Sequence, residues 1–296
     1  MDERAVAPVV AAMLLLVVLV TFLSAYNAVV VPSFKQQAEV EHLHAVEESF
    51  LAFGSDMTTA AALKRDLQLS KRIPLGGGET GLDPVRSAGT LRVDPGGTLA
   101  NVTLDGKPPY NCSLVNFSYT PNGNFWRDQG YTWQYGYTNV TGAGGLRTPL
   151  EYADMDEVSR VLAENSSFAA SLIDIEPEGT RGGACTAVRI TLVTFEAGEH
   201  AFTSGSGVAT LSLDASVEEI PITLADSTLE IAINTTLPVP LNAPLLEKCN
   251  RRLQEMNETY TNINYIPSEE GTAMLSFEGD VPGVTLRLVR VVVSAR

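Results

Sequence analysis

Residues 5–34 read AVAPVVAAMLLLVVLVTFLSAYNAVVVPSF and contain no charged side chain. At about 1.5 Å of rise per residue, a helix of this length exceeds the roughly 20 residues that cross the hydrocarbon core of a bilayer. A secretory signal peptide has a shorter apolar region of about 7–15 residues, followed by a small-residue cleavage site. Residues 24–26 offer such a site, but the apolar character resumes at once over residues 28–31. The stretch therefore predicts a retained membrane helix rather than a discarded signal.

The helix is predicted to continue through residues 35–73 as an amphipathic stalk. Apolar residues recur there at spacings of three and four, namely Val40, Leu43, Val46, Phe50, Phe53, Met57 and Ala60. Gly54 interrupts this pattern and costs about 1 kcal/mol in a helix interior, so we expect a kink or break there and a second helical piece over 58–70. Two interpretations stand side by side. The stripe packs on the chain's own globular domain, or Leu43, Val46, Phe50 and Phe53 form an assembly seam with neighbouring subunits.

Residues 74–88 are rich in Pro and Gly and are predicted to form a hinge, after which the character changes. Short β-branched runs separated by Gly, Pro, Asn and Asp predict a mainly-β antiparallel sandwich over residues 89–296, with one or two short helices. Helices are expected over 150–164 and 245–256. Strands are expected over 89–93, 98–104, 114–119, 131–140, 187–195, 207–214, 229–234, 273–278 and 284–294.

Charge and motif searches argue against catalysis and against nucleic-acid binding. The formal charge is −15 with a pI near 4.6, whereas nucleic-acid binding needs clustered Lys and Arg. GGGETGL at 76–82 lacks the Lys of a phosphate loop, and TSGSG at 203–207 lacks the leading Gly of a nucleophile elbow and predicts a hairpin turn. His42 and His44 are about 200° apart on a helix and cannot share a metal. We expect no enzyme activity, no metal and no cofactor, and keep an anchored surface hydrolase as a remote alternative.

The asparagines and cysteines of the chain indicate in which cellular compartment the protein lies. Seven N-x-[ST] sequons exceed the chance expectation and predict an exported, glycosylated surface; a composition rich in Thr and Asn is the alternative explanation. Three cysteines allow at most one disulfide and one free thiol. The sequons begin at Asn101, Asn111, Asn116, Asn139, Asn165, Asn234 and Asn257, and the cysteines are Cys112, Cys185 and Cys249.

Aromatic residues are dense between residues 117 and 137, where both tryptophans of the chain lie. Such a window either binds sugars or partner proteins, because large amphipathic rings supply contact area at low entropy cost, or it fills a β-domain core. The alternation in YTWQYGY, residues 131–137, favours core packing.

The N-terminus has a recognisable likeness. The segment ERAVAPVVAAMLLLVVLV, a short charged stub before a long apolar helix, resembles that of archaeal type IV pilin-like proteins. The continuation QQAEVEHLHAVEESFLAF, with IPLGGG and GTLRV after it, is similar to a group of uncharacterised archaeal surface proteins with this N-terminus. The resemblance is fairly specific over residues 2–53, weaker to about residue 93 and absent beyond.

The resemblance implies a class III signal peptide, which is cut before the apolar helix so that the helix stays in place. Residues 1–4 are then the stub and the matching bond is Arg4–Ala5, although Arg4 stands where a small residue commonly precedes the cut. The orientation follows from the sequons, because Lys and Arg are nearly balanced on the two sides of the apolar helix: we expect a single-pass protein with a cytoplasmic N-terminus and an extracellular C-terminal domain. The resemblance implies that this protein is held by membrane lipid or built into a surface filament with other pilin-like subunits. The alternative is an anchored module that does not polymerise and binds the S-layer, a sugar or another envelope protein.

Overall fold

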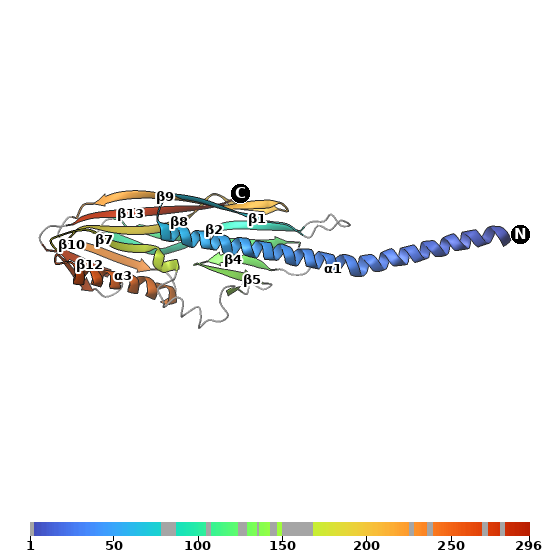
Figure 1. Cartoon of the computed structure of the whole chain (residues 1–296), viewed down its shortest axis with the longest axis horizontal. Coiled ribbons are helices and arrows are strands. Elements are labelled where there is room, and N and C mark those ends of the chain that lie inside the picture. The colour runs from blue at the N-terminus through green and yellow to red at the C-terminus, as the bar shows by residue number, and fades with distance from the viewer. Residues whose placement is uncertain are drawn as a thin grey trace.

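The computed structural model of the chain describes residues 3–77, 87–104, 108–123, 129–134, 136–142, 147–149, 168–224, 228–235, 239–267, 272–278 and 282–296. One long N-terminal helix projects from a mostly-β domain, and one further α-helix lies against that domain at the end distant from the N-terminus (Figure 1). The expected helix over 150–164 and Asn165 lie outside the described residues.

Helix α1 runs unbroken from Glu3–Leu63, a length of 61 residues. Its N-terminal half is a bare rod that points away from the molecule, and its C-terminal half lies along the β-domain (Figure 1). The helix passes through Gly54 without interruption, so the expected break there is wrong. The physical reason is contact: a Cβ at Gly54 would lie 3.0 Å from Cδ1 and Nε1 of Trp133. Glycine is present because the indole edge packs directly on the helix backbone.

This close approach gives a stability prediction. We expect Gly54→Leu to lower the free energy of unfolding by about 1–3 kcal/mol, because the added atoms must displace the buried Trp133 ring. Ser55→Leu, at the next and exposed position, is the control and should change stability by less than about 0.5 kcal/mol. Urea unfolding followed by tryptophan fluorescence measures both. Equal midpoints for the two variants would contradict the proposed packing.

The helix ends at Leu63, and the chain reverses at Lys64, which has a left-handed backbone at φ 49° and donates its N–H to the carbonyl of Ala60. Strand β1, Leu67–Pro74, follows immediately. The expected second helical piece over 58–70 and the stalk to residue 73 are therefore wrong at their C-terminal ends. Residues 67–73 alternate in exposure and pair with another strand, which a helix cannot do.

The strands that the structure describes form one connected mixed sheet of 13 strands. Its main order is β1-β9-β13-β8-β2-β3-β4-β5-β6; β7 pairs with β8, and β10 joins β2 to β12 and thereby to β11. The bounds are β2 Ala88–Leu104, β3 Tyr110–Asn122, β4 Gly130–Gln134, β5 Tyr137–Thr141, β6 Arg147–Pro149, β7 Ile173–Arg181, β8 Ala184–Gly205, β9 Val208–Ile222, β10 Thr228–Thr235, β11 Ile263–Pro267, β12 Thr272–Phe277 and β13 Gly283–Ala295.

The mainly-β prediction is confirmed, but the sheet is not purely antiparallel. β13, the last strand, inserts between β8 and β9 and runs parallel to β8. The TSGSG turn therefore joins two strands that are separated by a third, and it does not close a hairpin. Nothing in the local sequence of β13 specifies this partner.

Two further strand expectations need correction. The expected turn at 94–97 is a bulged part of the continuous strand β2, where the register shifts after Pro95 and Gly97 adopts φ +86°. The expected single strand over 131–140 is two strands, β4 and β5, which reverse at Gly136 with φ +92°.

The α-helix α3, Val239–Thr259, contains the expected segment 245–256. Its buried residues Leu245, Cys249, Leu253 and Met256 belong to the same continuous core as α1 and the sheet. The short 3₁₀ helix η1, Phe168–Ser171, contacts both α1 and α3.

Candidate functional site

The first candidate site is the apolar half of α1. It is the one helix among the described residues that is long and apolar enough to cross a membrane, and its most apolar 18-residue window has a mean hydropathy of 2.5 with none of it buried. The side chains of Leu15, Val18 and Phe22 are 63–67% exposed. A row of large apolar side chains without any protein cover requires an apolar environment.

The second half of α1 is instead covered by its own domain. Val46, Phe50 and Phe53 are fully buried and Leu43 is 6% exposed. The structure thus places the proposed assembly seam under the chain's own sheet, which is the first of the two interpretations drawn from the sequence. In this fold those four side chains are not on a free surface that a neighbouring subunit can reach.

Aromatic rings join this helix face to the sheet. Phe117 lies at the centre: its ring centroid is 5.2 Å from Phe50, 5.1 Å from Phe53 and 5.2 Å from Trp133, with which it stacks at 11°. Tyr131 lies 5.9 Å from Phe50. The aromatic window is core at Phe117, Tyr119, Tyr131 and Trp133, as the alternation indicated, whereas Tyr137 is partly exposed. Phe125, Trp126 and Tyr135 lie outside the described residues.

Hydrogen bonds between buried polar groups fix the position of α1 along the sheet. The Tyr119 hydroxyl donates to the carbonyl of Leu75, so its oxygen is left to accept the Nε2–H of His42, 3.0 Å away. The Tyr131 hydroxyl lies 3.0 Å from the carboxylate of Glu47 and 3.3 Å from the carbonyl of Leu43. Each tyrosine thus links the sheet to one turn of α1, and sliding the helix by one turn would break the contacts of Tyr119 with His42 and of Tyr131 with Glu47.

Burial shifts the pKa values of these groups. It lowers the pKa of His42, although the nearby Glu39 carboxylate opposes the shift, and it raises the pKa of Tyr119 to about 12, with Glu39 acting in the same direction. The lowered pKa favours the neutral form of His42 in the folded protein, where its ring lies 3.0 Å from the Tyr119 hydroxyl.

This lowered pKa predicts how stability depends on pH. The unfolded state takes up a proton at His42 near pH 6.5 and the folded state only at lower pH, so the stability that His42 contributes is complete above pH 6.5 and is lost as the pH falls below it. We expect the urea midpoint to decrease more between pH 7.5 and 5.5 in the wild type than in His42→Gln. The exposed His44→Gln is the control and should follow the wild type. Identical pH slopes in all three proteins would contradict the prediction.

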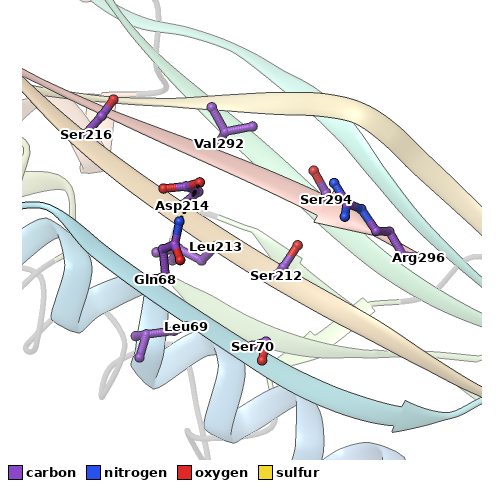
Figure 2. A pocket seen from close by; sticks show the side chains of 10 residues that line it. All are labelled: Gln68, Leu69, Ser70, Ser212, Leu213, Asp214, Ser216, Val292, Ser294 and Arg296. Carbon is purple, nitrogen blue, oxygen red and sulfur yellow. Dashed lines mark hydrogen bonds between the residues drawn. The ribbon is translucent and has the colours of Figure 1, made fainter.

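The second candidate site is a trough on the outer face of β1, β9 and β13, with a volume of about 550 Å³ (Figure 2). Short side chains line its floor, because Ser70, Ser212 and Ser294 lie opposite one another on the three strands. The next row is Gln68, Asp214 and Val292, in which the Gln68 amide donates to the Asp214 carboxylate at 3.1 Å. A hollow forms over the serine row because the side chains beside it are longer.

The trough is lined by hydrogen-bonding groups. Hydroxyls from three strands, one carboxylate and Arg296 line it. The lining residues include no His, Cys or Lys that can activate a serine as a nucleophile. The sequence analysis missed this site, because three serines from distant strands meet only through the strand pairing.

The other candidate residues are dispersed. The thiols of Cys112, Cys185 and Cys249 are free and buried, and burial raises the pKa of Cys112 and Cys249 to about 12. The structure thus holds no disulfide among them. Within the described part of the chain no three His, Cys, Asp or Glu side chains are grouped to hold a metal ion.

In comparison with known proteins, no family model, no curated protein and no solved structure matches the chain.

Proposed function

We propose that the chain is a non-enzymatic, pilin-like surface protein, held in a membrane by residues 5–34 and displaying its β-domain outside the cell. The observation that carries this proposal is the division of one continuous helix. Its first half exposes mainly apolar side chains, and one face of its second half is buried in the domain of the same chain. Because the helix is unbroken, the anchor and the domain are mechanically joined.

The exterior placement rests on the β-domain's sequence. Seven sequons, all in this domain, and a net charge of −15 over the whole chain suit a hydrated, glycosylated surface. We include a cytoplasmic N-terminus in this proposal because of the sequons, and processing at Arg4–Ala5 because of the N-terminal resemblance. We also propose a sandwich-like domain, since the Ser113 hydroxyl lies 2.8 Å from that of Thr194, which brings β3 over β8 although the two are not strand neighbours.

Filament assembly follows as a physical mechanism. Since the seam on residues 43–53 is covered, we assign the contact between subunits to the bare apolar half of α1. Side-by-side packing of such helices, with acidic domains facing water, resembles helix association in lipid, which depends on van der Waals packing.

The proposal is tested on the native protein in its own membranes. Intact mass and N-terminal peptide mapping should give a chain that begins at Ala5, and protease added to intact cells should remove the β-domain. A chain that starts beyond residue 25 would exclude the retained helix. A β-domain that protease reaches only in broken cells would overturn the exterior placement.

A second candidate function is an anchored binding module that does not polymerise, and the serine trough favours it. Hydroxyls, an amide and a carboxylate suit a polyhydroxylated ligand such as a saccharide. A glycan array probed with residues 35–296 tests this candidate. Binding that is lost in Ser212→Phe, which fills the trough floor, and kept in Thr59→Phe, on the exposed face of α1, would support the module. If the protein bound no glycan, the trough would not be a saccharide-binding site.

A further inference from the structure

Three of the sequon asparagines stand in one row across the sheet. In the antiparallel pairing of β2 with β3, Asn101 is opposite Asn111, and in the pairing of β10 with β2, Asn234 is opposite Asn101. These residues are 10 and 133 positions apart in the chain, so only the strand register brings the three together.

Directly opposed residues of an antiparallel pair have Cβ atoms about 4.5–5.5 Å apart on the same face of the sheet. An N-linked glycan is bulky and must leave its asparagine toward solvent. Two glycans on opposed residues therefore compete for the same space. Asn101, on the central strand, has a sequon neighbour on both sides.

Asn111 differs from the other members of the row. Of the sequon asparagines whose side chains the structure describes, Asn111 is the exposed one, whereas Asn101 is partly buried. Among the described pairings, β3 meets β4 only at residues 117–119, so Asn111 lies at the margin of the sheet. We propose that Asn111 is the glycosylation site of this row and that Asn101 remains unmodified in the folded protein. This inference rests on the proposed exterior location of the domain.

The side chains of the remaining described sequon asparagines are held or partly buried in the fold. The Asn257 side-chain oxygen accepts the Tyr265 N–H at 2.9 Å, and the Asn116 side-chain oxygen is buried. Asn139 directs its amide nitrogen, the atom to which a glycan is joined, at the carbonyl of Thr132 at 3.5 Å.

The transfer is an ordinary substitution at a sugar carbon. The amide nitrogen of Asn111 bonds to the anomeric carbon of a lipid-phosphate-linked oligosaccharide, the bond from sugar to phosphate breaks, the lipid phosphate leaves and the amide loses one proton to a base of the transferase. The sequon hydroxyl, Ser113, is hydrogen-bonded to the buried Thr194 in the folded domain. Attachment therefore precedes the docking of β3 on β8, and the finished fold excludes chains that carry glycans at both Asn101 and Asn111.

Glycopeptide mass spectrometry of the native membrane protein tests the inference. We expect a glycan on the Asn111 peptide and an unmodified Asn101 peptide. Asn111→Gln should lower the intact mass by one glycan, and Asn101→Gln, the matched control one strand away, should not. A glycan on Asn101, or an unmodified Asn111, would overturn the inference.

Protease treatment of intact cells separates this outcome from the larger proposal. If the β-domain is outside and Asn111 is unmodified, the inference alone fails. If the domain is inside and no sequon is modified, the proposed function fails with it.

Discussion

Phe50→Asp should unfold the β-domain. The ring is fully buried and touches Phe117 and Tyr131 of the sheet, with centroids 5.2 and 5.9 Å away. Removing a buried Phe side chain costs about 3–5 kcal/mol, and an unpaired carboxylate in its place adds a desolvation penalty. The sum approaches the whole stability of a typical domain, about 5–15 kcal/mol. Near-ultraviolet circular dichroism and a urea titration measure the loss of packed aromatic side chains.

Ala45→Asp provides the matched control. Ala45 is exposed on the same helix, five residues before Phe50, so the same charge remains in water. We expect a loss below about 1 kcal/mol, which is the difference in helix propensity between the two residues. If Phe50→Asp left the circular dichroism and urea midpoint near those of Ala45→Asp while abolishing contacts between subunits, the seam would face other chains after all.

Helix α1 shows what hydrophobic periodicity in the sequence can predict. Spacings of three and four identified the face that is buried, from Leu43 to Ala60, but they cannot say what covers that face. The partner proved to be the chain's own sheet, brought there by Phe117 and Tyr131 from more than 60 residues away. The predicted break at Gly54 is wrong because the cost of glycine in helix propensity is local, whereas the Trp133 contact that requires glycine comes from a distant part of the chain.

The sheet shows the same limit. Runs of β-branched residues located most strands, including β13, yet the parallel pairing of β13 with β8 follows from no local signal. Strand β1 was missed, although Leu67, Leu69 and Ile73 alternate with polar residues in the sequence, because the helical pattern before it was extended too far. The serine trough and the asparagine row are both products of register, so neither could be read from the sequence.

Removal of residues 1–34 should release a folded β-domain into water. The described side chains of Val10–Leu23 are exposed, so they contribute no packing to the sheet, while every fully buried residue of α1 lies beyond Phe34. The truncated chain is expected in the soluble fraction, with a Tm within about 3 °C of the full chain in the same detergent. Fractionation and calorimetry measure the two properties separately.

The full-length double variant Leu16→Arg with Leu19→Arg separates the loss of membrane affinity from the effect of deleting residues 1–34. Each Arg near the centre of a spanning helix costs about 2.5–3.5 kcal/mol for insertion, so the pair should reduce membrane retention strongly while the Tm in detergent stays unchanged. A double variant retained as firmly as the wild type would mean that residues 5–34 are not the anchor. A truncated domain that unfolds would mean that the apolar half supports the fold, although the buried residues of α1 lie beyond Phe34.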